Sequence, residues 1–576
     1  MLKDYQINRF RGFRGIVTDV TDELIAMGYV PDAENMTIDI EGIARNLANP
    51  TKQVYLTDAP AWQANHVYQN YEVVQPAVPN GYLYYASVNG TSSGTEPAWG
   101  TNETSEIVDG TQTWKYLCRT SDEIKKIYLW DELDTPVLMV QTFKASNATY
   151  MSVIDTTNWV GKTFPNYVYP VSFASASVAG SFRLYIMNRS TAGGGGLWWY
   201  SYPLFTDISN PTDGKPPYTK HILVWNNRLW AYGNLVEADK TTEARFRIRC
   251  SSIVSKPEAK YDENGNPLPA PPNTGFDFWD ETYGYDSDGT PIPQGNHFDL
   301  VTAGHDDIQA VHSYGQMLGV VSKDSVMFIS GTSDTTFQTS IVYQGHDGAI
   351  ISDMVEADAL YYLSRNGCMA FTTPNPVDIS KAINSTIKTT LATIDADAYV
   401  EAVPKNLVYF KQRLYFLLND KIWAYHLERK TWEKYSYSNI RCLHSADHLY
   451  MGDTTGKVWK LDVAGSGFTT WYLYTPHLNW GDTFIKKVFE SMAVYYKIPS
   501  ASSTLLSAFY LDYSTTANNL TNKEMYLASH VGEMKDYSQR TISGAVGTIQ
   551  YKFSGTGEVK LFGYDVVYKL FWRKRG

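Results

Sequence analysis

The sequence predicts an all-β protein built around a β-propeller, and three observations predict it: a repeat, the period of that repeat, and an aromatic composition. The repeat reads Lys/Arg-Leu-Tyr, then a turn, then Gly/Asp-Lys-x-Trp, and its clearest copies are Arg413–Tyr435 and His448–Asp462. Each copy alternates apolar and polar residues around a turn, which is the pattern of a β-hairpin. Weaker copies lie at Arg183, Arg228, Gln316 and Leu360.

The spacing of the copies matches one propeller blade. Their leading leucines stand at positions 184, 229, 318, 360, 414 and 449, so the steps are 45, 89, 42, 54 and 35 residues. The longest step contains the Pro/Gly/Asp-rich stretch 255–295, without which 48 residues remain. A period of roughly 40–50 residues is typical of four-stranded blades. About six blades are readable, and Lys125–Trp130 is a candidate for a seventh. A repetitive β-sandwich or solenoid is the alternative, because alternation does not specify closure.

Composition favours strands over helices. The 576 residues include 43 Tyr and 16 Trp, and flat rings pack well on pleated surfaces. The clearest helical pattern is Asp378–Val400, where apolar residues recur at nearly helical spacing. A chain of this length is expected to form two to four structural units.

Charge and targeting signals narrow the function classes. The net charge is −11 without a long basic run, which argues against a protein that grips nucleic acid through its phosphates. An acidic wall would instead repel DNA and suit a conduit. The widely spaced cysteines, Cys118, Cys250, Cys368 and Cys442, predict buried thiols from a reducing compartment. No apolar run reaches the ~18–20 residues of a membrane span, so we expect a product made soluble in a cytoplasm.

The segment Ala59–Tyr116 has a turn pattern of its own, with the hairpin dipeptides Asn80-Gly81, Asn89-Gly90 and Asp109-Gly110. It resembles small β-rich modules related to chitin-binding domains that recur in phage tail proteins. Flat aromatic faces suit sugar rings, whereas in so small a domain the same residues can instead form the core. Both interpretations stay open for the candidate glycan-stacking residues Trp62, Tyr68, Tyr84, Trp99 and Trp114.

Several further segments, taken in order, resemble the tail hub or nozzle proteins of short-tailed, podovirus-like bacteriophages. Gly15–Leu47 resembles the family's opening, in which a Pro-containing loop leads into an Ala-Glu-Asn strand. Phe298–Gly331 and Phe337–Thr372 follow the order of apolar, Ser and Gly positions of these proteins, and the segment from Thr475 to the C-terminus resembles their terminal β-sandwich. The resemblance covers most of the chain but contains no invariant catalytic residue.

The resemblance implies four units. Residues 1–56 form an N-terminal platform segment, 57–118 an inserted carbohydrate-binding-like β module, 119–473 the propeller with an insertion at 255–297, and 474–576 a β-sandwich that completes the platform. It also implies a structural virion protein of the tail, assembled in the host cytoplasm. Such a subunit closes into a homo-oligomeric ring, commonly of six copies, below a portal-adaptor protein. The ring carries tail fibres or spikes and a needle or tip protein, and double-stranded DNA passes through it without sequence-specific binding.

Enzymatic interpretations find little support in the sequence. The close acidic pairs Asp306-Asp307, Asp286/Asp288 and Asp395/Asp397 are typical of solvated turns, and the histidines lack metal-ligand spacing. We therefore expect no catalytic, cofactor-binding or metal-binding residue and no cofactor. Two alternatives remain: a receptor-binding tail protein that recognises host surface glycan, and a propeller glycosidase.

Overall fold

The computed structural model covers the chain with gaps. The residues that it describes are 5–18, 29–39, 41–102, 104, 106–144, 151–164, 170–178, 181–189, 195–207, 216–233, 235–236, 244–251, 266, 279, 282–285, 291–293, 296–299, 307–332, 336–372, 375–392, 405–418, 421–478, 486–499, 503–514, 523–524, 534–540 and 546–570. All statements below refer to these residues.

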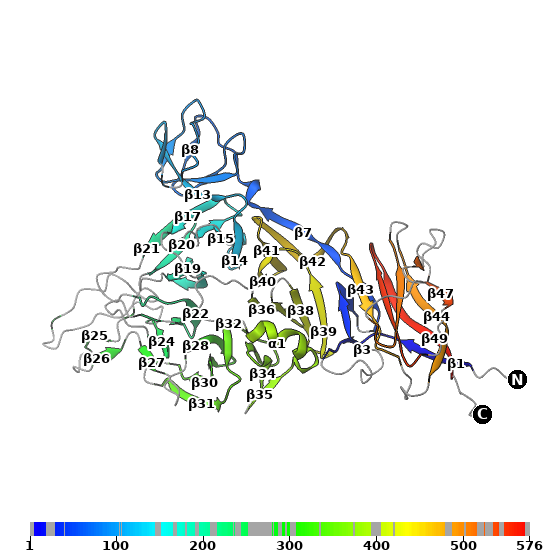
Figure 1. Cartoon of the computed structure of the whole chain (residues 1–576). Helices are drawn as coiled ribbons and strands as arrows, with labels where there is room; N and C mark the ends of the chain where they lie inside the picture. The colour runs from blue at the N-terminus through cyan, green and yellow to red at the C-terminus, as the bar shows by residue number, and fades with distance from the viewer. Residues whose placement is uncertain are drawn as a thin grey trace, which may run out of the picture.

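The central unit is a β-propeller of seven four-stranded antiparallel sheets, which fan around a common axis (Figure 1). Blade 1 contains β14 (Glu123–Trp130), β15 (Val137–Phe143), β16 (Met151–Asp155) and β17 (Val160–Phe164). Blade 2 contains β18 (Ser172–Val178), β19 (Ser181–Arg189), β20 (Gly195–Ser201) and β21 (Leu204–Asp207). Blade 3 contains β22 (His221–Trp225), β23 (Arg228–Tyr232), β24 (Arg247–Cys250) and β27 (Asn296–Asp299).

The remaining four blades follow in chain order. Blade 4 contains β28 (Ile308–Tyr314), β29 (Met317–Ser322), β30 (Ser325–Ser330) and β31 (Gln338–Gln344). Blade 5 contains β32 (Ala349–Glu356), β33 (Leu360–Ser364), β34 (Gly367–Thr372) and β35 (Asn375–Asp378). Blade 6 contains β36 (Lys405–Phe410), β37 (Arg413–Leu418), β38 (Lys421–His426) and β39 (Thr431–Ser436). Blade 7 contains β40 (Ile440–Ser445), β41 (Leu449–Asp453), β42 (Lys457–Phe468) and β7 (Ala48–Tyr55).

The repeat found in the sequence marks the second and third strands of a blade. Its leading leucines lie on the second strands of blades 2 to 7, and each is at most 2% exposed; they are Leu184, Leu229, Leu318, Leu360, Leu414 and Leu449. Blade 1 is the seventh unit, beyond the six that the repeat marks, and the candidate Lys125–Trp130 lies on its first strand, β14. Its second strand, β15, places Leu138 in the corresponding position but has Val137 where the repeat has a basic residue, which hides the copy from a pattern search.

An N-terminal strand closes the propeller ring. Strand β7 pairs antiparallel with β42 and so supplies the fourth strand of blade 7, although blade 1 starts about seventy residues later in the chain. Blade 1 packs directly on blade 7: the backbone N–H of Leu129 donates to His444 Nε2 at 3.0 Å, and Ile124 and Cys442 share one buried cluster. Buried clusters of this kind fill the gaps between neighbouring blades around the ring.

A β-sandwich flanks the propeller on one side (Figure 1). One sheet runs β47 (Met534–Arg540), β44 (Lys487–Lys497), β49 (Lys560–Leu570), β6 (Ala44–Asn46) and β5 (Met36–Ile38), with β1 (Tyr5–Arg11) also paired to β49. The other runs β4 (Asp32–Glu34), β43 (Trp471–Tyr474), β48 (Ile549–Gly555), β45 (Leu506–Leu511) and β46 (Lys523–Glu524). Both ends of the chain therefore contribute strands to both sheets, and rings such as Phe10 and Tyr564, stacked with centroids 4.7 Å apart, fill the space between them.

The aromatic module stands on the edge of blade 1 (Figure 1). It follows β7 through the short 3-10 helix Leu56–Asp58 and contains one sheet of β12 (Glu106–Asp109), β13 (Gln112–Arg119), β10 (Tyr82–Ala86) and β9 (Val73–Val74). A second pair joins β8 (Val67–Tyr68) to β11 (Gly90–Thr91). The module is bonded to blade 1, because Val73 N donates to Trp159 O and Gly161 N donates to Tyr71 O, both at 2.8 Å.

The remaining elements are few. The predicted helix at Asp378–Val400 is present as a 3-10 turn, Lys381–Ile383, and α1 (Asn384–Ala392); residues 393–400 lie outside the described range. The insertion falls between β24 and β27, and its described part includes the hairpin β25 (Thr282–Tyr285) and β26 (Pro291–Pro293). Within the described residues, no helix is long and apolar enough to span a bilayer. All four cysteines are buried, as predicted, and burial raises the pKa of the Cys442 thiol to about 12.

The repeat leucines should be among the most costly positions to truncate. Leu414→Ala removes a fully buried side chain from β37, and we expect it to lower the free energy of unfolding by about 2–5 kcal/mol. Leu204→Ala on β21 is the matched control, because Leu204 is 55% exposed, and we expect a change within about 0.5 kcal/mol. Urea denaturation followed by tryptophan fluorescence measures both. Equal losses in the two variants would contradict the assigned blade core.

Candidate functional site

The module encloses four of the five candidate glycan-stacking rings. Trp62 is 9% exposed and Tyr68 4%, while Tyr84 and Trp114 are fully buried in the same cluster. Trp99 is partly exposed and packs on this cluster, with its ring centroid 4.5 Å from Tyr84 and 5.8 Å from Trp114.

A buried aspartate organises this aromatic core. The indole N–H groups of Trp62 and Trp114 donate to Asp109 Oδ2 at 2.8 and 3.0 Å, and the backbone N–H and hydroxyl of Ser93 donate to Asp109 Oδ1. Burial opposes ionisation, but these hydrogen bonds together outweigh it and lower the pKa of Asp109. The sequence marked Asp109 only as half of a turn dipeptide. Its position beside two tryptophans is non-local and could not be read from the pattern.

The burial of Trp62, Tyr68, Tyr84 and Trp114 favours the core interpretation of these residues over glycan stacking. A sugar ring needs an open aromatic face, and these side chains present theirs to one another. These four side chains form the hydrophobic core of the module, which is too small to form a core without them. Trp99 is the member of the set with an accessible portion, and its indole N–H donates to Glu96 Oε1 at 2.7 Å.

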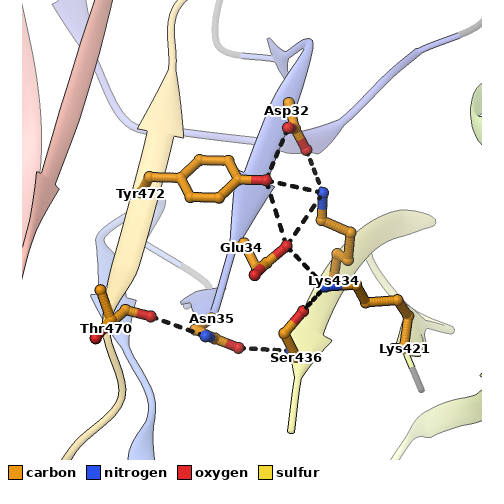
Figure 2. A network of polar contacts seen from close by, with 8 residues as sticks. All are labelled: Asp32, Glu34, Asn35, Lys421, Lys434, Ser436, Thr470 and Tyr472. Carbon is orange, nitrogen blue, oxygen red and sulfur yellow. Dashed lines mark hydrogen bonds and ion pairs between the residues drawn. The ribbon is translucent and has the colours of Figure 1, made fainter. Parts of the chain in front are cut away.

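Figure 2 shows a polar network where the sandwich meets the propeller. We call this network the joint. It consists of Asp32, Glu34, Asn35, Lys421, Lys434, Ser436, Thr470 and Tyr472. Strands β4 and β43 of the sandwich contribute one side, and β38 and β39 of blade 6 contribute the other. Lys434 pairs with Asp32 and Glu34, and Lys421 Nζ lies 3.2 Å from Glu34 Oε2.

Asn35 connects three segments in the joint. Its side-chain Nδ2 donates to Thr470 O at 2.8 Å, and its Oδ1 accepts from the backbone N–H of Ser436 at 2.7 Å (Figure 2). Its own backbone N–H donates to Lys434 O at 2.9 Å. Asn35 has a φ of 58°, a left-handed conformation that asparagine tolerates better than most residues. These contacts let Asn35 bond the edge of β39 as a neighbouring strand would.

The electrostatics of the joint favour the ionised form of Glu34. The Lys434 side chain is 11% exposed and that of Glu34 is 20% exposed. Burial opposes ionisation of Glu34, but Ser436, Lys421 and Lys434 together outweigh it and lower the pKa of Glu34. Beside the joint, Glu433 is 2% exposed and accepts from Arg413 Nη1 at 2.9 Å and from the backbone N–H of Ile38 at 2.9 Å. The Ala-Glu-Asn segment noted in the sequence contributes Glu34 and Asn35 to the joint.

The inner wall of the propeller is the place where a glycosidase would hold its acids. First strands of neighbouring blades pack against each other, as β32 does on β28 and β36, and β14 does on β40. Three carboxylates lie on the first strands: Glu123, Asp353 and Glu356.

Each of these carboxylates is bonded to a neighbouring blade. Glu123 Oε2 accepts from Arg441 Nε of blade 7 at 3.0 Å, and Glu356 Oε1 accepts from the backbone N–H of Gly315 of blade 4 at 3.0 Å. Asp353 Oδ2 accepts from Asn406 of blade 6, whose Oδ1 in turn accepts from the backbone of blade 7. The acids of the inner wall therefore serve as links between blades.

Of the other acidic and histidine residues singled out in the sequence, those that the structure describes lie apart from one another. Asp307 accepts from Lys323 Nζ at 2.7 Å and lies 3.4 Å from Arg245 Nη1, while Asp306, Asp286, Asp288, Asp395 and Asp397 lie outside the described residues. His312 Nδ1 contacts the carbonyl of Ser313 at 2.8 Å, and the His346 side chain is 97% exposed. In the described part of the chain, no three His, Cys, Asp or Glu side chains gather in a metal-binding group.

No protein-family model and no curated protein matches the sequence. Among solved structures, the propeller domain of the Trilobed protease from Pyrococcus furiosus is 9% identical, with 59% of this chain and 99% of that chain covered and a TM-score of 0.30. A glycoside hydrolase family 43 arabinoxylan arabinofuranohydrolase from Bacillus subtilis is 9% identical, with 89% and 97% covered and a TM-score of 0.19. PorZ of Porphyromonas gingivalis is 11% identical, with 86% and 59% covered and a TM-score of 0.25. Likenesses this distant assign no activity to this chain.

The two roles of the aromatic residues can be separated by substitution. Trp114→Ala empties the centre of the module and removes one donor to Asp109, so we expect the module to lose about 3–5 kcal/mol and to unfold locally. Trp99→Ala removes a peripheral ring and should cost about 1 kcal/mol. Hydrogen exchange with mass spectrometry reports on the module and the propeller separately. Loss of module protection in Trp99→Ala as complete as in Trp114→Ala would contradict this division.

The joint should make stability sensitive to acid. Because the pKa of Glu34 is lowered in the folded protein, its ionised form contributes stability above its ordinary value near 4.5. That contribution is lost as the pH falls through the lower folded-state pKa. We expect Glu34→Gln to destabilise the protein by roughly 1 kcal/mol at pH 7 and to flatten the acid limb of the curve of unfolding free energy against pH. Parallel curves for the two proteins below pH 4.5 would contradict the role given to Glu34.

Proposed function

We propose that this protein is a non-enzymatic virion component, a tail hub or nozzle subunit of a short-tailed bacteriophage. The observation that carries the proposal is the inner wall of the propeller. Its three first-strand carboxylates, Glu123, Asp353 and Glu356, are each engaged with an adjacent blade. A glycosidase needs two opposed acids directed at a substrate, whereas a frame needs its polar groups paired internally.

The connections between the sandwich and the propeller also support a structural role. The sandwich is fixed to blade 6 by the joint, and the strand that leaves the sandwich closes blade 7. A cyclic ring uses two different patches that meet head to tail, and it closes only when their relative orientation is fixed. A subunit whose platform and propeller are tied together meets that requirement.

The proposed partners follow from the same role. The subunit would form a ring of about six copies below a portal-adaptor protein and hold tail fibres or spikes and a tip protein in the virion. Its net charge of −11 suits a conduit, since an acidic lumen repels the phosphates of passing DNA.

Receptor binding is the second candidate, and Trp99 is the observation that favours it. A partly exposed indole beside the carboxylate of Glu96 offers one apolar face and one hydrogen-bond acceptor. Sugar recognition commonly combines these two features, but one ring gives a weaker platform than the five that the sequence indicated.

Particle imaging and mass measurement test the proposal. We expect the purified full-length protein to form cyclic rings of about six copies in negative-stain images and in mass photometry, to dock onto tail-less capsids, and to release no sugar from host surface polysaccharide. A monomer that releases reducing sugar would refute the structural role. A monomer that retains glycan without cleaving it, and loses it in Trp99→Ala, would favour receptor binding instead.

A further inference from the structure

We propose that a hollow between the N-terminal segment and blade 6 is a binding site for a small phosphate-type oxyanion. The hollow has a volume of about 420 Å³, and three arginines line it: Arg11 and Arg14 of the N-terminal segment, and Arg429 of blade 6. Arg11 ends β1, Arg14 lies in the loop before β2 (Gly15–Ile16), and Arg429 lies in the turn between β38 and β39. The proposal does not depend on the hub function.

The lining of the hollow is positively charged, whereas the whole chain carries a net negative charge. The protein carries −11, whereas the lining has three guanidinium groups and one carboxylate, that of Glu41. Arg11 is held in place from behind: its Nη1 lies 2.7 Å from Asp565 Oδ1, and its guanidinium lies 4.0 Å from the centre of the Tyr495 ring. Arg11 is therefore already paired, and Arg429 is attracted by Glu433, Asp39 and Glu428. Arg14 supplies the charge that no ion pair offsets in the described part of the chain.

Arg14 and Arg429 lack a carboxylate partner in the described part of the chain. Arg14 is exposed and lies 5.9 Å from the centre of the Tyr29 ring, which also lines the hollow. Arg429 Nη1 donates to the backbone carbonyl of Ile38. Burial and repulsion from Arg413 both disfavour the charged form of Arg429. Together they outweigh the attraction of Glu433, so the pKa of Arg429 is lowered. A cation in such surroundings gains from an added anion.

Two glycines let the two segments that line the hollow approach each other closely. Gly12 and Gly42 have φ values of 81° and 80°, and a Cβ on Gly42 would lie 2.8 Å from the Cα of Gly12. The backbone N–H of Phe13 donates to Gly42 O at 2.7 Å, which fixes this contact between the two segments. A side chain at Gly42 would break this contact, so the backbone lining of the hollow depends on glycine at this position.

The chemistry and the size of the hollow favour a phosphate group. Guanidinium groups pair with phosphate through two parallel N–H···O bonds, and several forks around one cavity suit an anion with three or four oxygens. A volume of about 420 Å³ falls in the range of small-ligand pockets and exceeds what one phosphate fills. The phosphate can come from inorganic phosphate itself or from a larger phosphorylated molecule, and the two sources are distinguished by their affinities.

Calorimetric titration of the full-length protein with inorganic phosphate and with pyrophosphate, at constant ionic strength, tests the site. The key variant is Arg14→Gln, because Arg14 is exposed and its loss should leave the fold intact. Arg9→Gln is the matched control: it removes the same charge from an exposed position on β1 that does not line the hollow. Arg429 is less suitable, since it also holds the carbonyl of Ile38.

We expect saturable binding of at least one probe to the wild type and to Arg9→Gln, and at least tenfold weaker binding to Arg14→Gln. Tighter binding of pyrophosphate than of phosphate would support the site and indicate a larger phosphorylated molecule as its source. Absence of binding to the wild type, or equal weakening in both variants, would overturn the proposal. Thermal melts of the three proteins without ligand verify that the fold is retained. Imaging of rings without phosphate binding would refute this site and leave the hub function standing.

Discussion

The pairing of β7 with β42 is the contact on which the rest of the architecture depends. Here the strand that completes the last blade comes from a segment that precedes blade 1 by a whole module, so it ties the end of the propeller to the segment before its start. The same segment has already passed through both sheets of the sandwich, as β4, β5 and β6. Blade closure, the platform and the attachment of the module are thus linked through a single stretch of chain.

Packing and charge reinforce this connection at blade 6. One continuous buried cluster runs from Tyr361 of blade 5 through Trp432 of blade 6 to Tyr564 of the sandwich, so the two units share a core. The joint then specifies how they meet, because the carboxylates of Asp32 and Glu34 face lysines from two strands of blade 6. Apolar burial supplies most of the adhesion, and the paired charges fix the orientation. This combination suits an assembly subunit, in which orientation decides whether a ring closes.

The sequence predicted the propeller well because its signal is local and repeated. Leu414 and its equivalents each start a hairpin whose turn and alternation lie within about twenty residues. Blade 1 gave a weaker signal, through Lys125–Trp130 alone, because its second strand lacks the basic residue of the repeat. The aromatic residues show the limit of this method: composition located Trp62 and Trp114, but whether a ring faces inward depends on Asp109, almost fifty residues after Trp62. The joint could not be predicted from the sequence, because its partners Asn35 and Ser436 are 401 positions apart.

The place of β7 in the chain has a mechanical consequence. Its first residue, Ala48, follows the sandwich, and its last, Tyr55, leads into the module. A force that pulls the module away from the sandwich is therefore directed along β7. Hydrogen bonds between antiparallel strands lie perpendicular to the strands, so such a force loads the β7–β42 ladder in shear and all its bonds resist together. The ladder therefore resists traction on the module with many hydrogen bonds at once, whereas a pull across the strands would break them one after another.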